Sequence, residues 1–220
     1  MSANDTSRLP YNATHHIHKF ESQIAIPSYL IAIAAGDLQR VSLGKRVGII
    51  SEPTQLPAAK KELEELESYL DKVEEYMGIP YVWGQYNILV LPPSFPFGGM
   101  ENPLLTFVSP TMIAGDKSQV ATAIHEVAHS WTGNLVTCKN WNDFWLNESL
   151  TVFIQRKITS RIYGAERANS EALIESFNLQ TSLENMSTDS GLSKLHPSVS
   201  DMQNTTPDHA KSAVQYEKGF

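Results

Sequence analysis

The sequence predicts an α+β fold, in which helices and a few strands follow one another without regular β-α-β alternation. Two patterns carry this prediction. Short apolar runs bounded by glycine and proline occur in residues 20–50, and apolar residues at three- and four-residue steps recur beyond residue 60. The composition can support a packed core, because 41% of the 220 residues are hydrophobic and 19% are charged.

The first 50 residues contain the predicted strands. Residues 1–16 are polar, and we expect them to form an irregular tail. Strands are predicted at residues 24–26, 29–35 and 46–50, where β-branched and other apolar residues cluster between breaks. Pro27 places the strand residues beside it at an edge or a bulge, because proline has no backbone N–H to donate.

A helix is predicted after a connecting segment at residues 51–57, which is rich in proline, threonine and glutamine. Its apolar stripe recurs at helical spacing and comprises Leu63, Leu66, Leu70, Val73 and Met77. This spacing indicates one helix of about 20 residues. Gly78 and Pro80 should end it.

The remaining chain is predicted to be mostly helical. Strands are expected at residues 86–91 and 104–108, on either side of a glycine-rich loop. Helices are expected over residues 118–131, 145–163 and 165–183, and a polar loop over 185–208.

The sequence His-Glu-Val-Ala-His at residues 125–129 is the main chemical signal. On a helix, His125 and His129 project about 40° apart, so both imidazoles can reach one zinc ion. Glu126 can then act as general base on a zinc-bound water. Chance would give about 0.02 such matches in this composition. The alternative is a pair of helix histidines that simply pair with carboxylates.

A hydrolytic zinc needs a third protein ligand and a fourth position left for water. Glu148 follows His129 by 19 residues and lies near the start of the next predicted helix. An antiparallel return of the chain would bring it back over the histidines. We therefore predict one zinc ion per chain, bound by His125, His129 and Glu148. Alone, Glu148 would be an ordinary first-turn carboxylate.

Charge and cysteine content restrict the partners and the compartment. The net charge of −7 and the pI of about 5.5 argue against nucleic acid or an anionic membrane as a partner. No run of 18 apolar residues predicts a membrane span. Cys138 is the single cysteine, and the glycosylation sequon at Asn147 adjoins a proposed zinc ligand. Both observations favour a cytoplasmic location.

These motifs resemble the zinc aminopeptidases of the gluzincin clan, the membrane alanyl aminopeptidase family, and especially its leukotriene A(4) hydrolase-like branch. Besides the histidine motif and Glu148, the resemblance rests on residues 92–97, 98–102 (Gly-Gly-Met-Glu-Asn), 129–137 and 216–220. It implies a thermolysin-like catalytic domain over residues 51–220, preceded by the end of a β domain at 17–50.

The resemblance also implies roles for residues 98–102, which we call the substrate loop, and for a tyrosine. Glu101 would bind the free α-amino group of a peptide, and Gly98, Gly99 and Met100 would lie along an extended substrate. Tyr216 would donate a hydrogen bond to the tetrahedral oxyanion. Without the resemblance, the loop is a tight acidic turn and the tyrosine an amphipathic surface residue.

The chain departs from the family pattern at two positions. Ser149 stands where the family has glycine after the zinc glutamate, and Lys211 stands where the leukotriene hydrolase branch has a second tyrosine. Asp208 matches that branch's acidic position and is a candidate substrate-binding residue. The change at residue 211 argues against hydrolysis of a lipid epoxide.

The sequence therefore predicts a zinc aminopeptidase that acts on peptides with a free N-terminus. Glu101 disfavours an endopeptidase. The competing hypothesis is a non-catalytic fragment that binds zinc structurally or serves as an interaction module. Family members are much longer than this chain, so we expect a fragment whose hydrolysis of peptides is weak or absent when it stands alone.

Overall fold

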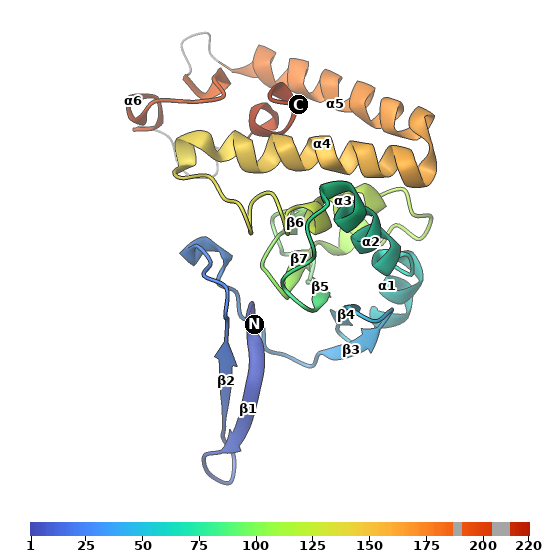
Figure 1. Cartoon of the computed structure of the whole chain (residues 1–220), viewed down its shortest axis with the longest axis vertical. Helices are drawn as coiled ribbons and strands as arrows, with labels where there is room; N and C mark the ends of the chain where they lie inside the picture. Colours follow the sequence, from blue (N-terminus) through green and yellow to red (C-terminus); the bar gives the residue numbers. More distant parts are fainter. Residues whose placement is uncertain (187–190, 204–211) are drawn as a thin grey trace. The chain divides into compact units, whose positions relative to one another are not determined.

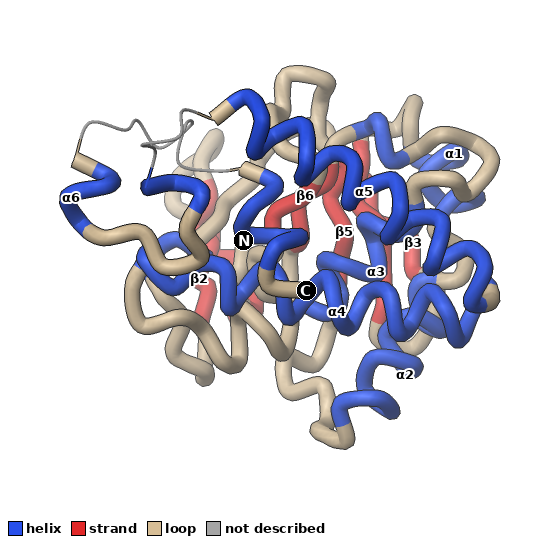
Figure 2. Tube along the Cα trace, turned by 90° about the horizontal axis from the view of Figure 1, so that it is seen from above, coloured by secondary structure: helices blue, strands red, loops and turns tan. Residues whose placement is uncertain are grey.

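The computed structural model describes residues 1–186, 191–203 and 212–220, and the chain divides into two units, residues 1–130 and 131–220. Asp208 and Lys211 lie outside the described residues. The α+β prediction is confirmed, because the chain contains both helices and sheets (Figures 1 and 2). Each unit is described by itself.

The first unit begins with an antiparallel hairpin of β1 (Asn4–Pro10) and β2 (His16–Glu21). The prediction of an irregular tail here was wrong. Nearly every residue of both strands is exposed, so no buried apolar face marks them in the sequence. The turn instead depends on Asn12, whose side-chain oxygen accepts hydrogen bonds from the backbone N–H groups of Thr14 and His15.

A five-stranded sheet forms the core of the first unit, in the order β3-β4-β5-β7-β6. Its strands are β3 (Gln39–Ser42), β4 (Val47–Ser51), β5 (Tyr86–Val90), β6 (Gly99–Met100) and β7 (Thr106–Val108). The three central strands β4, β5 and β7 are parallel, and the edge strands β3 and β6 run antiparallel to their neighbours. The predicted strands at 46–50, 86–91 and 104–108 are confirmed to within two residues.

The predicted strands at 24–26 and 29–35 were wrong. This stretch contains only a 3-10 turn, Ser28–Leu30, which directly follows Pro27. Burial alternates as in a strand, since Leu30 and Ala32 are buried while Ile31 and Ile33 are exposed, but the segment belongs to neither of the described sheets. Strand β3 was missed because it is a mostly exposed edge strand.

Two helices replace the single long helix predicted after residue 57: α1 (Leu56–Glu62) and α2 (Leu66–Met77). Helix α1 packs on β4, and α2 packs on α3 (Val120–Ala128), which carries most of the histidine motif (Figure 1). Of the predicted apolar stripe, α2 buries Leu66, Leu70 and Val73, whereas Met77 is half-buried. The helix ends at Gly78, whose positive φ of 65° suits glycine.

Glu62 fixes the loop that leads into α3. Its buried carboxylate accepts hydrogen bonds from the backbone N–H groups of Gly115 at 3.0 Å and Lys117 at 2.8 Å. Both loop residues have positive φ, an arrangement that is unfavourable for lysine. The Lys117 ammonium also binds the exposed carboxylate of Glu64. The carboxylate of Glu62 therefore holds a strained turn in place.

Replacing Glu62 with glutamine should lower the free energy of unfolding by about 1–3 kcal/mol, because the loop N–H groups lose a charged, buried acceptor. Urea denaturation would measure the change. Glu64→Gln is the matched control, since its exposed ion pair should contribute at most about 1 kcal/mol. Equal losses in the two variants would contradict a special role for Glu62.

The second unit is helical. Helix α4 (Phe144–Tyr163) and helix α5 (Ala165–Asn185) are joined at Gly164 and lie side by side (Figure 1). Both agree with the predicted helices to within two residues. The unit also contains α6 (Val199–Met202) and a π-helical turn, η5 (Val214–Lys218), which packs on α4 and α5. Within the described ranges, none of the helices has the length and hydropathy to cross a membrane.

Candidate active site

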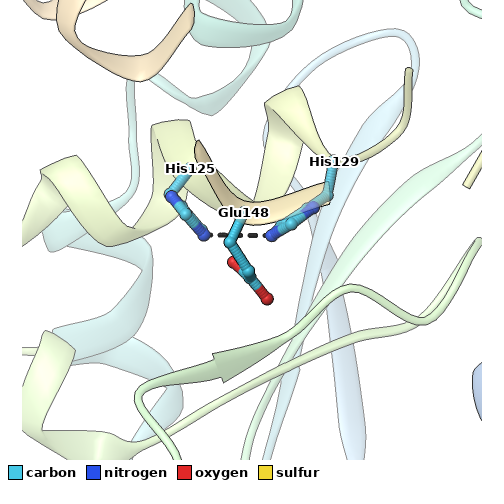
Figure 3. Close-up of side chains that lie close together, drawn as sticks. All are labelled: His125, His129 and Glu148. Atoms are coloured by element: carbon cyan, nitrogen blue, oxygen red, sulfur yellow. Dashed lines mark hydrogen bonds between the residues drawn. The ribbon is translucent and has the colours of Figure 1, made fainter. Parts of the chain in front are cut away.

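His125 lies in the last turn of α3, and His129 directly follows the helix. The two side chains point to the same side (Figure 3). Their Nε2 atoms are 3.0 Å apart, and the ring planes are nearly perpendicular. His129 is only 1% exposed, and His125 is half-buried. Trp83 donates a hydrogen bond from its indole N–H to the carbonyl of Ser130, which ties down this end of the helix.

The histidine geometry fits a tetrahedral metal ion. Two nitrogen ligands on one zinc ion, each bonded at 2.0–2.1 Å, stand about 3.3–3.4 Å apart. The observed separation of 3.0 Å between the Nε2 atoms is close to that value. Two neutral imidazoles can share only one hydrogen in this arrangement, whereas a cation can accept a lone pair from each ring. The donor set therefore suits a metal.

Glu126 lies between the histidines in sequence, and its side chain is 4% exposed. Strand β6 comes very close to it. A Cβ atom placed on Gly99 would lie 2.0 Å from Oε1 of Glu126, a distance that no side chain could tolerate. Glycine at this position therefore leaves room for the carboxylate of Glu126 beside the backbone of β6.

Glu101 brings a second buried carboxylate to the same part of the first unit. It is 6% exposed and directly follows β6. Burial raises the pKa of the neighbouring Tyr86 phenol well above its ordinary value, and the negative charges of Glu126 and Glu101 raise it further. The two carboxylates thus create a negative potential around Tyr86.

Glu148 lies in the second turn of α4, and its carboxylate is buried. Among the described residues, two groups of side chains could hold a metal ion, each with ligand atoms within 4.8 Å of one another. One group is His125, His129 and Glu148, which Figure 3 shows together. The other is Glu101, Glu126 and His129. Only the first contains the pair of facing imidazoles.

Tyr216 lies on η5 and is half-buried. Gly98 and Met100 flank Gly99 on the substrate loop, where the Gly98 carbonyl accepts a hydrogen bond from the Ser109 N–H. The remaining candidate, Asp208, lies outside the described residues. The sequence did not point to Arg156, which forms a buried ion pair with Glu217 next to Tyr216. No spacing signal connects residues so far apart in the chain.

Residues 61–220 match the Peptidase family M1 domain. The curated relatives include "Leucine aminopeptidase 2" of Emericella nidulans, which is 41% identical over 100% of this chain and 35% of that protein. They also include "Leukotriene A-4 hydrolase" of Xenopus laevis, which is 45% identical over 95% of this chain and 34% of that protein.

Solved structures give the same picture. Yeast LTA4 hydrolase in complex with bestatin superimposes with a TM-score of 0.88 at 41% identity. The match covers 100% of this chain and 34% of the yeast protein. The chain thus spans about a third of the length of the relatives that it matches.

Proposed function

Because this chain belongs to peptidase family M1, we propose that it contributes the catalytic centre of a zinc aminopeptidase, which removes the N-terminal residue from peptides. The observation that carries this proposal is the pair of facing Nε2 atoms of His125 and His129, with the buried Glu126 on the same helix turn. Facing imidazoles suit a cation, and an adjacent carboxylate suits proton transfer.

We propose that His125, His129 and Glu148 hold one zinc ion. Two imidazoles and one carboxylate are a donor set typical of hydrolytic zinc, since they leave a coordination position open. When bound, zinc would polarise the scissile carbonyl and lower the pKa of water.

Glu126 is proposed as the general base. Its carboxylate is buried, it is not assigned as a zinc ligand, and it lies where Gly99 leaves room for it beside β6. A base held in this way can accept a proton from water and pass it to the leaving amine. Tyr216 is proposed to donate its phenol hydrogen to the oxyanion, where one such donor supplies about 10²–10³ in rate.

Glu101 is proposed to select substrates by their free α-ammonium group. Its carboxylate is buried, so a substrate that brings a positive charge to it is favoured over one that brings an amide. Strand β6 is an edge strand of the sheet, and the backbone groups of Gly98 to Met100 can align an extended peptide beside it. Proposed substrates are therefore peptides with a free N-terminus.

Elemental analysis after purification in zinc-containing buffer should give one zinc ion per chain. Glu148→Ala and His125→Ala should each reduce the zinc content well below one, because three protein ligands would become two. Glu101→Gln is the matched control, since it changes a buried carboxylate of the other candidate group. Loss of zinc in Glu101→Gln together with full zinc in Glu148→Ala would assign the ion to the other group.

A further inference from the structure

We propose that Ser149 is a positioning residue for Tyr216, holding η5 to the helix that carries Glu148. The inference rests on the proposed function, in which Tyr216 donates to the oxyanion. It concerns the second unit alone, since α4 and η5 both belong to that unit.

The central observation is one buried hydrogen bond. The Ser149 hydroxyl donates to the backbone carbonyl of Gln215 at 2.7 Å, and Ser149 is only 1% exposed. Ser149 follows Glu148 directly, and Gln215 directly precedes Tyr216. The Ser149 side chain thus connects the position next to Glu148, the proposed metal ligand, with the position next to Tyr216, the proposed oxyanion donor.

The acceptor of this hydrogen bond indicates that Ser149 holds η5 against α4. A serine inside a helix ordinarily bonds to the carbonyl four residues earlier on its own helix. The Ser149 hydroxyl instead reaches a carbonyl 66 residues away in sequence. Because η5 is a π-helical turn of five residues, its own backbone pairing gives it little stability, and bonds from α4 matter more.

Three further contacts hold η5 and the two residues after it, on the other side of Tyr216. The Arg156 guanidinium donates to the Glu217 carboxylate at 2.6 Å, with both side chains less than 10% exposed. The same guanidinium lies 4.1 Å from the ring centroid of Phe220. Gly219 packs so closely on α4 that an added Cβ would lie 2.5 Å from the Ser149 hydroxyl oxygen. Residues on both sides of Tyr216 in the sequence therefore contact α4.

The first test is amide hydrogen exchange of the full chain, which needs no enzymatic activity. Ser149→Ala should speed exchange at residues 214–218 by about two- to tenfold, the range expected for one buried hydrogen bond. Thr151→Val is the matched control. Its hydroxyl is fully buried on the same helix and bonds the carbonyls of Asn147 and Thr132, two residues that lie outside η5. If both variants speed amide exchange at residues 214–218 equally, the proposal that Ser149 holds η5 in place is wrong.

The second test is a double-mutant cycle on kcat with an N-terminal amino-acid anilide. Ser149→Ala should lower kcat by about two- to tenfold when Tyr216 is present, and leave it unchanged in the Tyr216→Phe background. Equal losses in both backgrounds would show that Ser149 acts through general stability and overturn its positioning role. Normal turnover in Tyr216→Phe alone would instead overturn the oxyanion role of Tyr216, which belongs to the proposed function.

Discussion

Replacing Glu126 with glutamine is expected to lower kcat by about 10²–10⁴-fold, the range for loss of a general base, while zinc content stays at one ion per chain. Glutamine has nearly the same shape as glutamate, so it should fit the buried space beside Gly99. It cannot accept a proton from water at neutral pH. The measurements are kcat on an amino-acid anilide and elemental analysis of the same preparation.

Glu62→Gln provides the control for Glu126→Gln. It makes the same chemical change at another buried carboxylate of the first unit, one that only binds a loop backbone. It should leave turnover per bound zinc unchanged. Near-normal kcat in Glu126→Gln would contradict the proposed base.

The histidine pair could be predicted from the sequence because it depends on helix geometry alone. Residues four apart on any α-helix share a face, so the motif places two imidazoles together wherever the helix packs. Helices α4 and α5 were predictable for a similar reason, since Gly164 interrupts two long apolar patterns. The hairpin of β1 and β2 was not, because strands exposed on both faces carry no apolar alternation.

Other features of the site depend on tertiary packing and leave no local signal. The close approach of Gly99 to Glu126 requires β6 to lie against α3, and no spacing predicts that contact. The break between α1 and α2 was missed because the apolar stripe continues through Leu63. Ser149 was noticed only as a departure from a family pattern, and its bond to Gln215 appears only in the folded chain.

Acetylating the N-terminus of a peptide substrate is expected to weaken its hydrolysis by about 2–5 kcal/mol in kcat/KM, the typical cost of removing one partner from a buried charge pair. An acetylated substrate brings an amide to Glu101, whose buried carboxylate would then lack its cation. Burial is the main cause of the raised pKa of Tyr86, and the negative charges of Glu126 and Glu101 raise it further. A positive charge beside these two carboxylates is therefore favoured. The measurement compares kcat/KM for matched free and acetylated peptides.

Glu101→Gln separates selection of the amine from a general effect on the site. Glutamine keeps the shape of the side chain but lacks the charge, so hydrolysis of the free peptide should fall while the acetylated peptide changes little. The ratio of kcat/KM for the free peptide to kcat/KM for the acetylated peptide should therefore decrease. Equal decreases in kcat/KM for both peptides would indicate that Glu101 supports the loop after β6 and does not bind the α-ammonium group. Equal cleavage of free and acetylated peptides by the unmodified chain would remove the argument for an aminopeptidase, because a buried carboxylate that binds an ammonium group must distinguish the two.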